Sequence, residues 1–470
     1  MANSNQGSVA SQVESLQHRF AQSPGLPFGE LLPAELLDRL LAEHGGEFHE
    51  RIYTPLITLA MFLSQCCDPD PSLNQAVARL ITQRLARKLP ACSSQTGAYS
   101  RARGRLPEKV VAELTRHTGK QLMQQAPTRW RWQGRQVKVV DGSTASMPDT
   151  EENQNAYPQM ASQQPGLGFP IVRFVVIFSL ATGSVLDADF RPYTGKETSE
   201  LAMLRGLHDH FENGDVVLGD RHFCSFFEIA ELQRRGVDVV LRQHQQRKTD
   251  FRKGVQLGPC DHLIVWRKPA RPAWMDPETY AQYPDEMVMR EVRIRIPCRG
   301  RKVRTRVLTL ATTLCDAHEY RKSAIMRLYR RRWDAELNLR SLKTVMQMDV
   351  LRCKTPSMVR KEMWVHFLAY NLIRKVMAEA AQEFRIEPWT ISFKGTLQTL
   401  NAFALPLVTC VKSELPELID ELLLAIARHS VGHRPNRIEP RALKRRPKPY
   451  DLLRKPRVEA RTLELKTSCE

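Results

Sequence analysis

Several features that define common protein classes are missing from this sequence of 470 residues. Its ten cysteines include no CxxC pair and no regular spacing, which argues against a disulfide framework or a standard zinc finger. The longest apolar stretches, such as residues 54–67, are too short to span a bilayer, and the N-terminal residues lack the basic and apolar segments of a signal peptide. We therefore expect a soluble, cytoplasmic protein that does not associate with a membrane.

Two short histidine and cysteine pairs could in principle supply zinc ligands. His222 and Cys224 form one pair, and Cys260 and His262 form the other. The two ligands of each pair are separated by a single residue, which is closer than the usual spacing in zinc sites. We therefore favour ordinary thiols and histidines in a reducing compartment.

Acidic residues are scarce relative to basic ones. The chain has 51 Asp and Glu against 70 Lys and Arg, a net charge of +19. A balance of this kind points to a polyanionic partner such as nucleic acid, although ribosomal and membrane-surface proteins share it. The hydrophobic fraction of 42% and the length predict a folded protein with more than one domain.

Composition and periodicity change several times along the chain. Helical periodicity comes first, alternating and β-branched strands follow, and helical periodicity returns towards the end. We divide the chain into a flexible N-terminus (1–30), a helical region (31–126), the first part of a mixed α/β core (127–243), a β-rich insertion that we interpret as an inserted sheet (244–310), the second part of the core (311–380), a C-terminal helical region (381–431) and a basic, proline-rich tail (432–470).

Two predicted strands of the core end in an aspartate. A short β-branched strand ends at Asp141, and a second strand, residues 215–220, ends at Asp220. The carboxyl ends of strands are the usual place for a site in a sheet of this kind. Either aspartate alone would more often be a turn-former or a helix cap.

The stretch from Tyr329 to Lys343, YRRRWDAELNLRSLK, has the pattern of one helix with a polar line along it. At about 100° per residue, Tyr329, Arg332, Glu336 and Lys343 fall at about 0°, 300°, 340° and 320° on the helical wheel. The helix also carries an apolar stripe that should dock on a core, formed by Ala324, Leu328, Ala335, Leu339, Leu342 and Met346. The polar line therefore runs along the edge of the docked face, where we expect a cleft. Glu336 by itself would be a surface ion-pair partner.

Two further basic segments are candidates for contact with phosphates. Arg101, Arg103 and Arg105 lie at a predicted turn between helices. Residues 432–457 are rich in Lys, Arg and Pro, cannot form a core and should be extended. The alternatives are a solvated basic surface and a solubilising tail.

Three carboxylates at strand ends and on a cleft suit a hard divalent cation. Asp141, Asp220 and Glu336 supply the oxygen ligands that magnesium prefers, and two such ions catalyse in-line phosphoryl displacement. Arg332 and Lys343 beside them could hold a nucleic-acid backbone by charge, and Tyr329 by its hydroxyl.

These motifs together resemble the insertion-sequence-four family of bacterial DDE transposases. The family has a DG[ST] strand end, a second Asp often followed by Arg, and a Y-x2-R-x3-E-x6-K motif. Here they are VVDGST at residues 139–144, VLGDRHF at residues 217–223, and residues 329–343 with every spacing intact. The resemblance implies an RNase H-like mixed sheet with flanking helices, interrupted by a β-rich insertion and preceded by an all-helical DNA-binding region.

The same resemblance implies an activity and the residues for it. A family member hydrolyses DNA at the transposon ends and joins the 3′-hydroxyl to target DNA, as a homodimer on its inverted repeats, with two Mg²⁺ ions per site that Mn²⁺ can replace. By matching position, the implied metal ligands and catalytic residues are Asp141, Asp220 and Glu336, and the implied end-DNA contacts are Tyr329, Arg332 and Lys343.

The roles of three other residues stay open under the resemblance. Arg221 and His222 follow the second Asp, where the family varies. Some members use an aromatic residue of the insertion to hold a flipped base. Trp266 lies in this insertion, and we favour core packing for it.

Two other functions are compatible with these residues. An RNase H-like nuclease could use the same acids without strand transfer, and it would not require the line of Tyr, Arg, Glu and Lys. A DNA-binding regulator derived from an inactive transposase could bind DNA without cutting it.

Overall fold

The computed structural model describes most of the chain. It covers residues 34–45, 52–86, 88–298, 304–411, 413–431 and 453–467. The expected flexible N-terminus and most of the basic tail, residues 432–452, lie outside the described residues.

The first described part of the chain is helical. Its helices are α2 (Ala34–His44), α3 (Pro55–Cys67), α4 (Leu73–Ala86), α5 (Gly97–Arg105) and α6 (Glu108–Gln125). Thr54 caps α3 by accepting a hydrogen bond from the Ile57 amide, and Pro55 occupies the first turn, where its missing N–H costs nothing. The amphipathic α6 packs against both the sheet and the long helix α13 (Pro356–Glu383).

A mixed sheet forms the centre of the molecule. Its first strands are β1 (Val137–Ser146), β2 (Ile171–Ser179), β3 (Val185–Pro192), β4 (Val216–Gly219) and β5 (Asp238–Arg242). They lie in the order β3-β2-β1-β4-β5, with β1 antiparallel to β2 and parallel to β4. Gly183 adopts a φ of 72° in the tight turn between β2 and β3, a conformation that glycine enters without steric cost. With helices on both faces, this sheet confirms the predicted RNase H-like mixed α/β fold.

The strands of the insertion continue this sheet. They are β6 (Val255–Gly258), β7 (Asp261–Arg267), β8 (Glu286–Cys298) and β9 (Arg304–Thr312), with the short helix α10 (Pro277–Ala281) between β7 and β8. Strand β9 pairs antiparallel with β5, so the full order is β3-β2-β1-β4-β5-β9-β8-β7-β6. The strands of the insertion therefore do not form a separate sheet, because β9 completes the hydrogen-bonding edge of β5.

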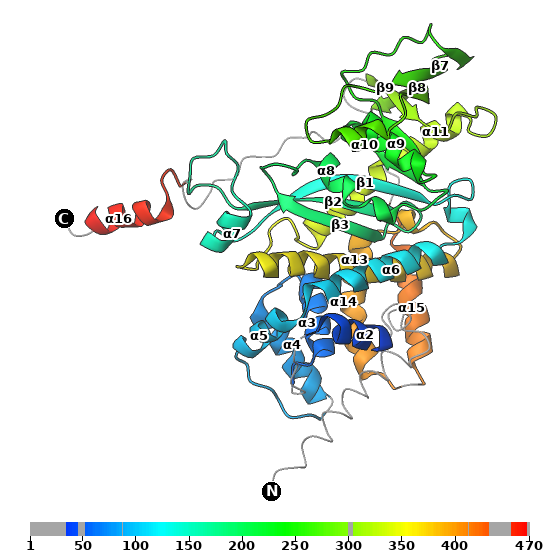
Figure 1. Ribbon diagram of the computed structural model, residues 1–470. Helices are drawn as coiled ribbons and strands as arrows, with labels where there is room; N and C mark the ends of the chain where they lie inside the picture. Colours follow the sequence, from blue (N-terminus) through cyan, green and yellow to red (C-terminus); the bar gives the residue numbers. More distant parts are fainter. Residues whose placement is uncertain are drawn as a thin grey trace.

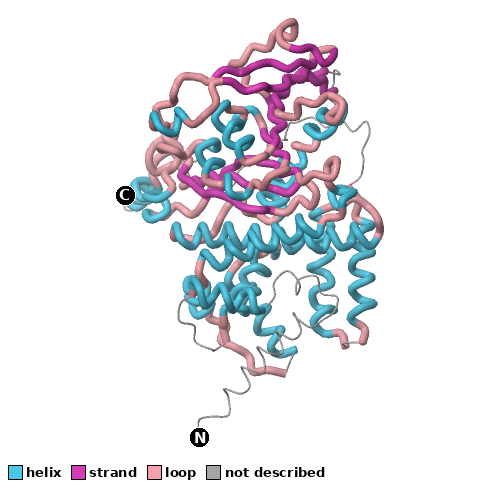
Figure 2. The backbone as a smooth tube through the Cα atoms, turned by 45° about the vertical axis from the view of Figure 1, so that its right-hand side comes forward, coloured by secondary structure: helices cyan, strands magenta, loops and turns pink. Residues whose placement is uncertain are grey.

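Helices cover the sheet on its two faces (Figure 1). On one face lie α6 and α13, with α14 (Phe393–Thr409) and α15 (Leu415–Arg428) beyond them, and on the other lie α8 (Glu200–Arg205) and α9 (Phe226–Arg234). Figure 2 shows the two long helices running side by side beneath the strands. A separate set of buried apolar side chains fills the space on each face, one including Val139 and the other Val140.

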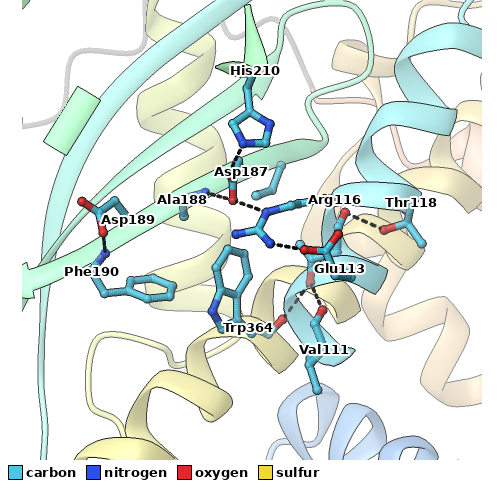
Figure 3. Close-up of polar contacts among 12 residues, drawn as sticks. Val111, Glu113, Arg116, Thr118, Asp187, Ala188, Asp189, Phe190, His210 and Trp364 are labelled. Atoms are coloured by element: carbon cyan, nitrogen blue, oxygen red, sulfur yellow. Dashed lines mark hydrogen bonds and ion pairs between the residues drawn. The ribbon is translucent and has the colours of Figure 1, made fainter. Parts of the chain in front are cut away.

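The join between α6 and β3 contains a buried ionic cluster (Figure 3). The Arg116 Nε donates to Asp187 Oδ1 at 2.9 Å, and the His210 Nε2 contacts the other oxygen of Asp187. The Trp364 ring of α13 lies 5.1 Å from the Arg116 guanidinium. Burial by itself raises the pKa of Asp187, but the His210 hydrogen bond and charge and the Arg116 charge outweigh it and hold this pKa below its ordinary value.

The remaining helices are short or lie near the chain end. They are α7 (Glu151–Ala156), α11 (Lys322–Arg330), α12 (Trp333–Arg340) and α16 (Arg457–Thr467). Helix α16 lies away from the core (Figure 1), in a part of the tail where no helix was predicted. Within the described ranges, none of the helices has the length and apolar character needed to cross a bilayer.

Candidate active site

The two aspartates lie where the parallel strands β1 and β4 end their pairing. The register between these strands covers Val137 to Val139, so Asp141 lies just beyond it. Strand β1 does not end at Asp141 as expected. It continues to Ser146 because its last residues pair with β2. Asp220 follows the last residue of β4 directly.

The segment from Tyr329 to Lys343 is not one continuous helix. Helix α11 ends at Arg330, α12 starts at Trp333, and a π-helical turn, η4, covers Ser341–Val345. At the first break the amides of Arg332 and Asp334 bond three residues back, which tightens the turn. The tight turn near Arg332 and the wider π-helical turn at Ser341–Val345 change the rotation per residue along the helix axis. A helical wheel with one constant angle therefore does not describe the whole segment.

The predicted docking stripe is confirmed. Its six apolar side chains all lie in the core, at 0–7% exposure. They are Ala324, Leu328, Ala335, Leu339, Leu342 and Met346. The broken helix is therefore fixed to the core on the predicted side.

The three predicted acids line one cleft, with a volume of about 470 Å³. The residues that form its walls are Asp141, Gly142, Asp220, Arg332, Glu336, Leu339, Arg340, Lys343, Thr344 and Asp349. The strand ends form one wall, and α12 with its π-turn forms the other. Acids far apart in the sequence therefore converge on one space.

Arg332 bridges two of the acids. Its Nη2 lies 2.6 Å from Glu336 Oε1, and its Nη1 lies 3.9 Å from Asp141 Oδ2. Burial raises the pKa of Asp141 to about 6, while the Arg332 charge and a hydrogen bond from the Gly142 amide oppose the rise. The charges of Asp220 and Glu336 contribute to this rise by a smaller amount.

Asp220 is held by the residue two positions after it. Its Oδ1 accepts a hydrogen bond from the His222 amide at 2.7 Å, and its Oδ2 lies 3.3 Å from the His222 ring Nδ1. Asp220 thereby caps the short helix η3 (Arg221–Phe223). The neighbouring Arg221 points elsewhere, since its guanidinium donates to Gln245 Oε1.

The other two residues of the polar line, Lys343 and Tyr329, lie in different surroundings. The Lys343 Nζ donates to Ser143 Oγ at 3.1 Å, on the wall of the cleft. Tyr329 does not line the cleft but is 3% exposed, and burial raises its pKa to about 12. Contact between its hydroxyl and DNA stays a prediction.

The donor set fits a hard divalent cation by its chemistry. Asp141, Asp220 and Glu336 present carboxylate oxygens to one open cleft, as magnesium requires. In the part of the chain that the structure describes, however, no group of three or more His, Cys, Asp or Glu side chains is already arranged around a common metal position. The acids share a cleft, and the Arg332 guanidinium contacts two of them.

The three arginines of the N-terminal region differ in exposure. They lie on α5, in its second half, and not in a turn between helices. Arg101 and Arg105 are exposed, whereas Arg103 is 9% exposed and packs 4.8 Å from the Phe62 ring centroid. A buried Arg103 does not agree with the expected phosphate contact.

The tryptophans of the insertion also differ in exposure. Trp266 is 2% exposed, and its indole donates to Glu291 Oε1 at 2.9 Å, which agrees with core packing. Trp274, which the sequence analysis did not single out, is 51% exposed, with the Arg205 guanidinium 3.6 Å from its ring centroid.

Five cleft residues were not recognised from the sequence as part of the site. They are Gly142, Arg340, Thr344 and Asp349, and also Leu339, which was assigned to the docking stripe alone. The glycine stands in the DG[ST] motif, so its position was a usable signal. Arg340 follows Glu336 by one helical turn, but Thr344 and Asp349 reach the cleft through the π-turn and the loop after it, which no periodicity predicts.

Comparison with known proteins gives three findings. The family model described as "Transposase DDE domain" matches residues 132–372. The transposase InsG for insertion sequence element IS4 of Escherichia coli (strain K12) is 27% identical to this chain over 453 residues, covering 94% of this chain and 96% of the relative. A cryo-EM structure of the piggyBac transposase synaptic complex with hairpin DNA matches with a TM-score of 0.43 and 9% identity, over 87% of this chain and 84% of that one.

Proposed function

From the premise that this chain belongs to the transposase DDE domain family, whose model spans half of it, we propose that it moves an insertion sequence by a cut-and-paste reaction. In this proposal a homodimer binds the terminal inverted repeats of its element, cuts the DNA beside them and joins the free ends to target DNA. The observation that carries the proposal is the convergence of Asp141, Asp220 and Glu336 on one cleft that also contains basic side chains.

The three acids share one part in the proposed chemistry. Asp141, Asp220 and Glu336 would hold two Mg²⁺ ions, or Mn²⁺ in their place, which when bound activate the attacking oxygen and stabilise the leaving one. Asp141 lies in strand β1, Asp220 directly follows β4 and caps η3, and Glu336 lies in α12. Acids on regular elements are held more precisely than acids on loops.

The basic residues of the cleft would bind the DNA backbone. Lys343 lies on the cleft wall with its ammonium on the hydroxyl of Ser143. Arg332 is shared between two acids, and its Nε is buried without a hydrogen-bond partner. A phosphate oxygen would accept from both side chains by charge-assisted hydrogen bonds.

The first experiment maps cleavage on a fragment that carries one inverted repeat and its flank. The protein is incubated with the fragment and Mg²⁺, beside Asp141→Asn and Glu336→Gln. The exposed Asp285→Asn of the insertion is the matched control. We expect the native protein and the control to cut at the repeat boundary, and the two cleft variants to bind the fragment but cut it at least 1000-fold more slowly, on the order of the loss caused by removing one essential catalytic group.

The two rival functions predict different products. A nuclease without strand transfer gives nicked DNA and no joined product when target DNA is added. A DNA-binding regulator gives specific binding that survives chelation of the metal and no cleavage with Mg²⁺ or Mn²⁺. Joined products that depend on all three acids would exclude both rivals.

A further inference from the structure

The glycine of the DG[ST] motif makes room for a carboxylate that the proposed mechanism does not use. A Cβ atom built on Gly142 would lie 2.4 Å from Glu200 Cδ and 2.5 Å from Glu200 Oε1. Contacts this short do not occur in folded proteins, so any side chain at position 142 would displace the carboxyl group of Glu200. The backbone of Gly142 has no positive φ, and the requirement for glycine is therefore one of space.

Glu200 approaches the active site from the back of the sheet. Neighbouring residues of a strand point to opposite faces, and Val139 and Val140 belong to different apolar clusters. Asp141 therefore faces the side of α12, where Arg332 lies, and Gly142 faces the side of α8. Glu200 thus does not join the cleft but lies behind one of its walls.

The position of Glu200 is fixed by the start of its helix. It is the first residue of α8, which Ser199 caps by accepting a hydrogen bond from the Ala202 amide at 3.2 Å. The preceding loop is tied to β2, where the Arg173 Nη1 donates to the Thr198 carbonyl at 2.8 Å. A short helix that is anchored at its start places its first side chain reproducibly.

His222 connects this carboxylate to the second catalytic acid. Its ring Nδ1 lies 3.9 Å from Glu200 Oε2 and 3.3 Å from Asp220 Oδ2. The His222 side chain is 56% exposed, so packing contributes little to the orientation of its ring. Electrostatic attraction to these two carboxylates is therefore the interaction available to orient the ring.

We propose that Glu200 is a positioning residue for Asp220, acting through the imidazole of His222, and that Gly142 is a glycine in order to admit its carboxyl group. The inference rests on the proposed function, since it assigns a support to one of the acids of that site. Side chains that orient a metal-ligating carboxylate typically change metal affinity or activity by about 10- to 100-fold when they are removed. Glu200 and His222 would contribute in this way without touching the DNA.

The test measures Mn²⁺ binding as well as cleavage. Binding of Mn²⁺ alone to the full chain is followed by the relaxation of water protons, and binding of the end fragment is measured in EDTA. We expect Glu200→Gln to weaken Mn²⁺ binding and slow cleavage by about 10- to 100-fold, with DNA binding in EDTA unchanged. Glu278→Gln, an exposed acid that also lies in the first turn of a helix, is the matched control and should change neither.

Two double-mutant cycles distinguish a positioning role of Glu200 from a general disruption of the fold. If Glu200 acts through His222, adding Glu200→Gln to His222→Ala should cause no further loss of Mn²⁺ affinity. If Gly142 serves only to admit Glu200, then Gly142→Ala should be as harmful as Glu200→Ala alone, and the pair together no worse than either. Thermal melting of each variant identifies any that does not fold, and the Gln variant keeps the shape of the side chain.

The possible outcomes are distinguishable. Native Mn²⁺ affinity and native cleavage in Glu200→Gln would overturn the inference and leave the proposed function standing. Fully additive losses in the His222 cycle would also overturn it, because Glu200 would then act by another route. A native protein that neither binds Mn²⁺ nor cuts the end fragment would refute the proposed function, and this inference with it.

Discussion

At the scale of single residues, the cleft brings together groups from distant parts of the chain. Lys343 and Ser143, 200 positions apart, form a hydrogen bond that joins the two walls. That bond keeps the lysine ammonium close to the strand that carries Asp141 and within the cleft. A long, flexible side chain held in this way loses less conformational entropy when a phosphate arrives.

Lys343→Ala should weaken binding of the end fragment or misalign it in the cleft. We expect a loss of cleavage of about tenfold or more, as for a removed charge-assisted contact, with the three acids left in place. Gel-shift titration and cleavage rates measure the two effects separately. Lys394→Ala, which removes an exposed lysine of α14, is the control. Normal binding and cutting by Lys343→Ala would remove this residue from the site.

Asp187 should make the stability of the protein depend on pH. Its folded-state pKa lies below its ordinary value, so its contribution is complete above the unfolded pKa of about 3.9 and is lost as the pH falls through the folded value. Asp187→Asn should cost about 3 kcal/mol near pH 7, because it leaves Arg116 without its buried partner.

Urea unfolding between about pH 5 and pH 2 tests this linkage, across the ordinary Asp pKa and below it. The unfolding free energy of the variant should fall less steeply with acid than that of the native protein. The half-exposed ion pair of Asp189 with Arg191 offers a neighbouring control, since Asp189→Asn should have a smaller effect. Equal slopes for the native protein and Asp187→Asn would refute the assignment.

Spacing and motifs predicted five of the residues that line the cleft, and periodicity predicted the buried apolar stripe, but the burial of Tyr329 and Arg103 was not predicted. Arg332, Glu336 and Lys343 meet at the cleft as predicted. Arg103 is buried against Phe62 of α3, and Tyr329 belongs to the larger apolar core cluster, which is assembled from distant parts of the chain. Periodicity within one segment contains no information about what another segment covers.

At the scale of elements, α13 connects the sheet to the helices beneath it. Asn371, which is fully buried, accepts from the Val185 amide at 2.7 Å and donates to the carbonyls of Val185 and Thr115. One side chain thus satisfies backbone groups of both β3 and α6. Sequence patterns predicted these three elements, but the polar contact that joins them depends on their packing.

Asn371→Leu should destabilise the fold on the order of 3 kcal/mol, since it leaves several buried backbone groups without a partner. Chemical denaturation measures the loss. The exposed Asn401→Leu on α14 serves as a control and should cost much less. A variant at position 371 as stable as the native protein would mean that water or a shifted backbone replaces these hydrogen bonds.

At the scale of the whole molecule, charge and topology are the dominant features. The excess of 19 positive charges is spread over the chain and includes the basic tail, of which residues 453–467 are described. The order of the first five strands follows from the predicted fold class. The pairing of β5 with β9 could not be predicted from the sequence, because it joins strands that are separated by the whole insertion. Such pairing depends on how the strands align in three dimensions.

The affinity for DNA should fall steeply with salt, because bound phosphates release counterions. Truncation after residue 431 removes a basic segment. The slope of log affinity against log salt concentration should therefore become less steep. Measurements on the end fragment and on unrelated DNA of equal length should show the same change of slope. An unchanged slope would exclude the tail as a phosphate-binding segment.

The continuity of the sheet has a consequence for any attempt to reduce the protein to a minimal nuclease. If the insertion were removed, β5 would become an unpaired edge strand, because β9 is its hydrogen-bonding partner on that side. Exposed edges of this kind template pairing between molecules and lead to aggregation. The insertion thus protects the core from self-association, and a shortened chain would need a new edge strand, or charges placed on β5, to remain monodisperse.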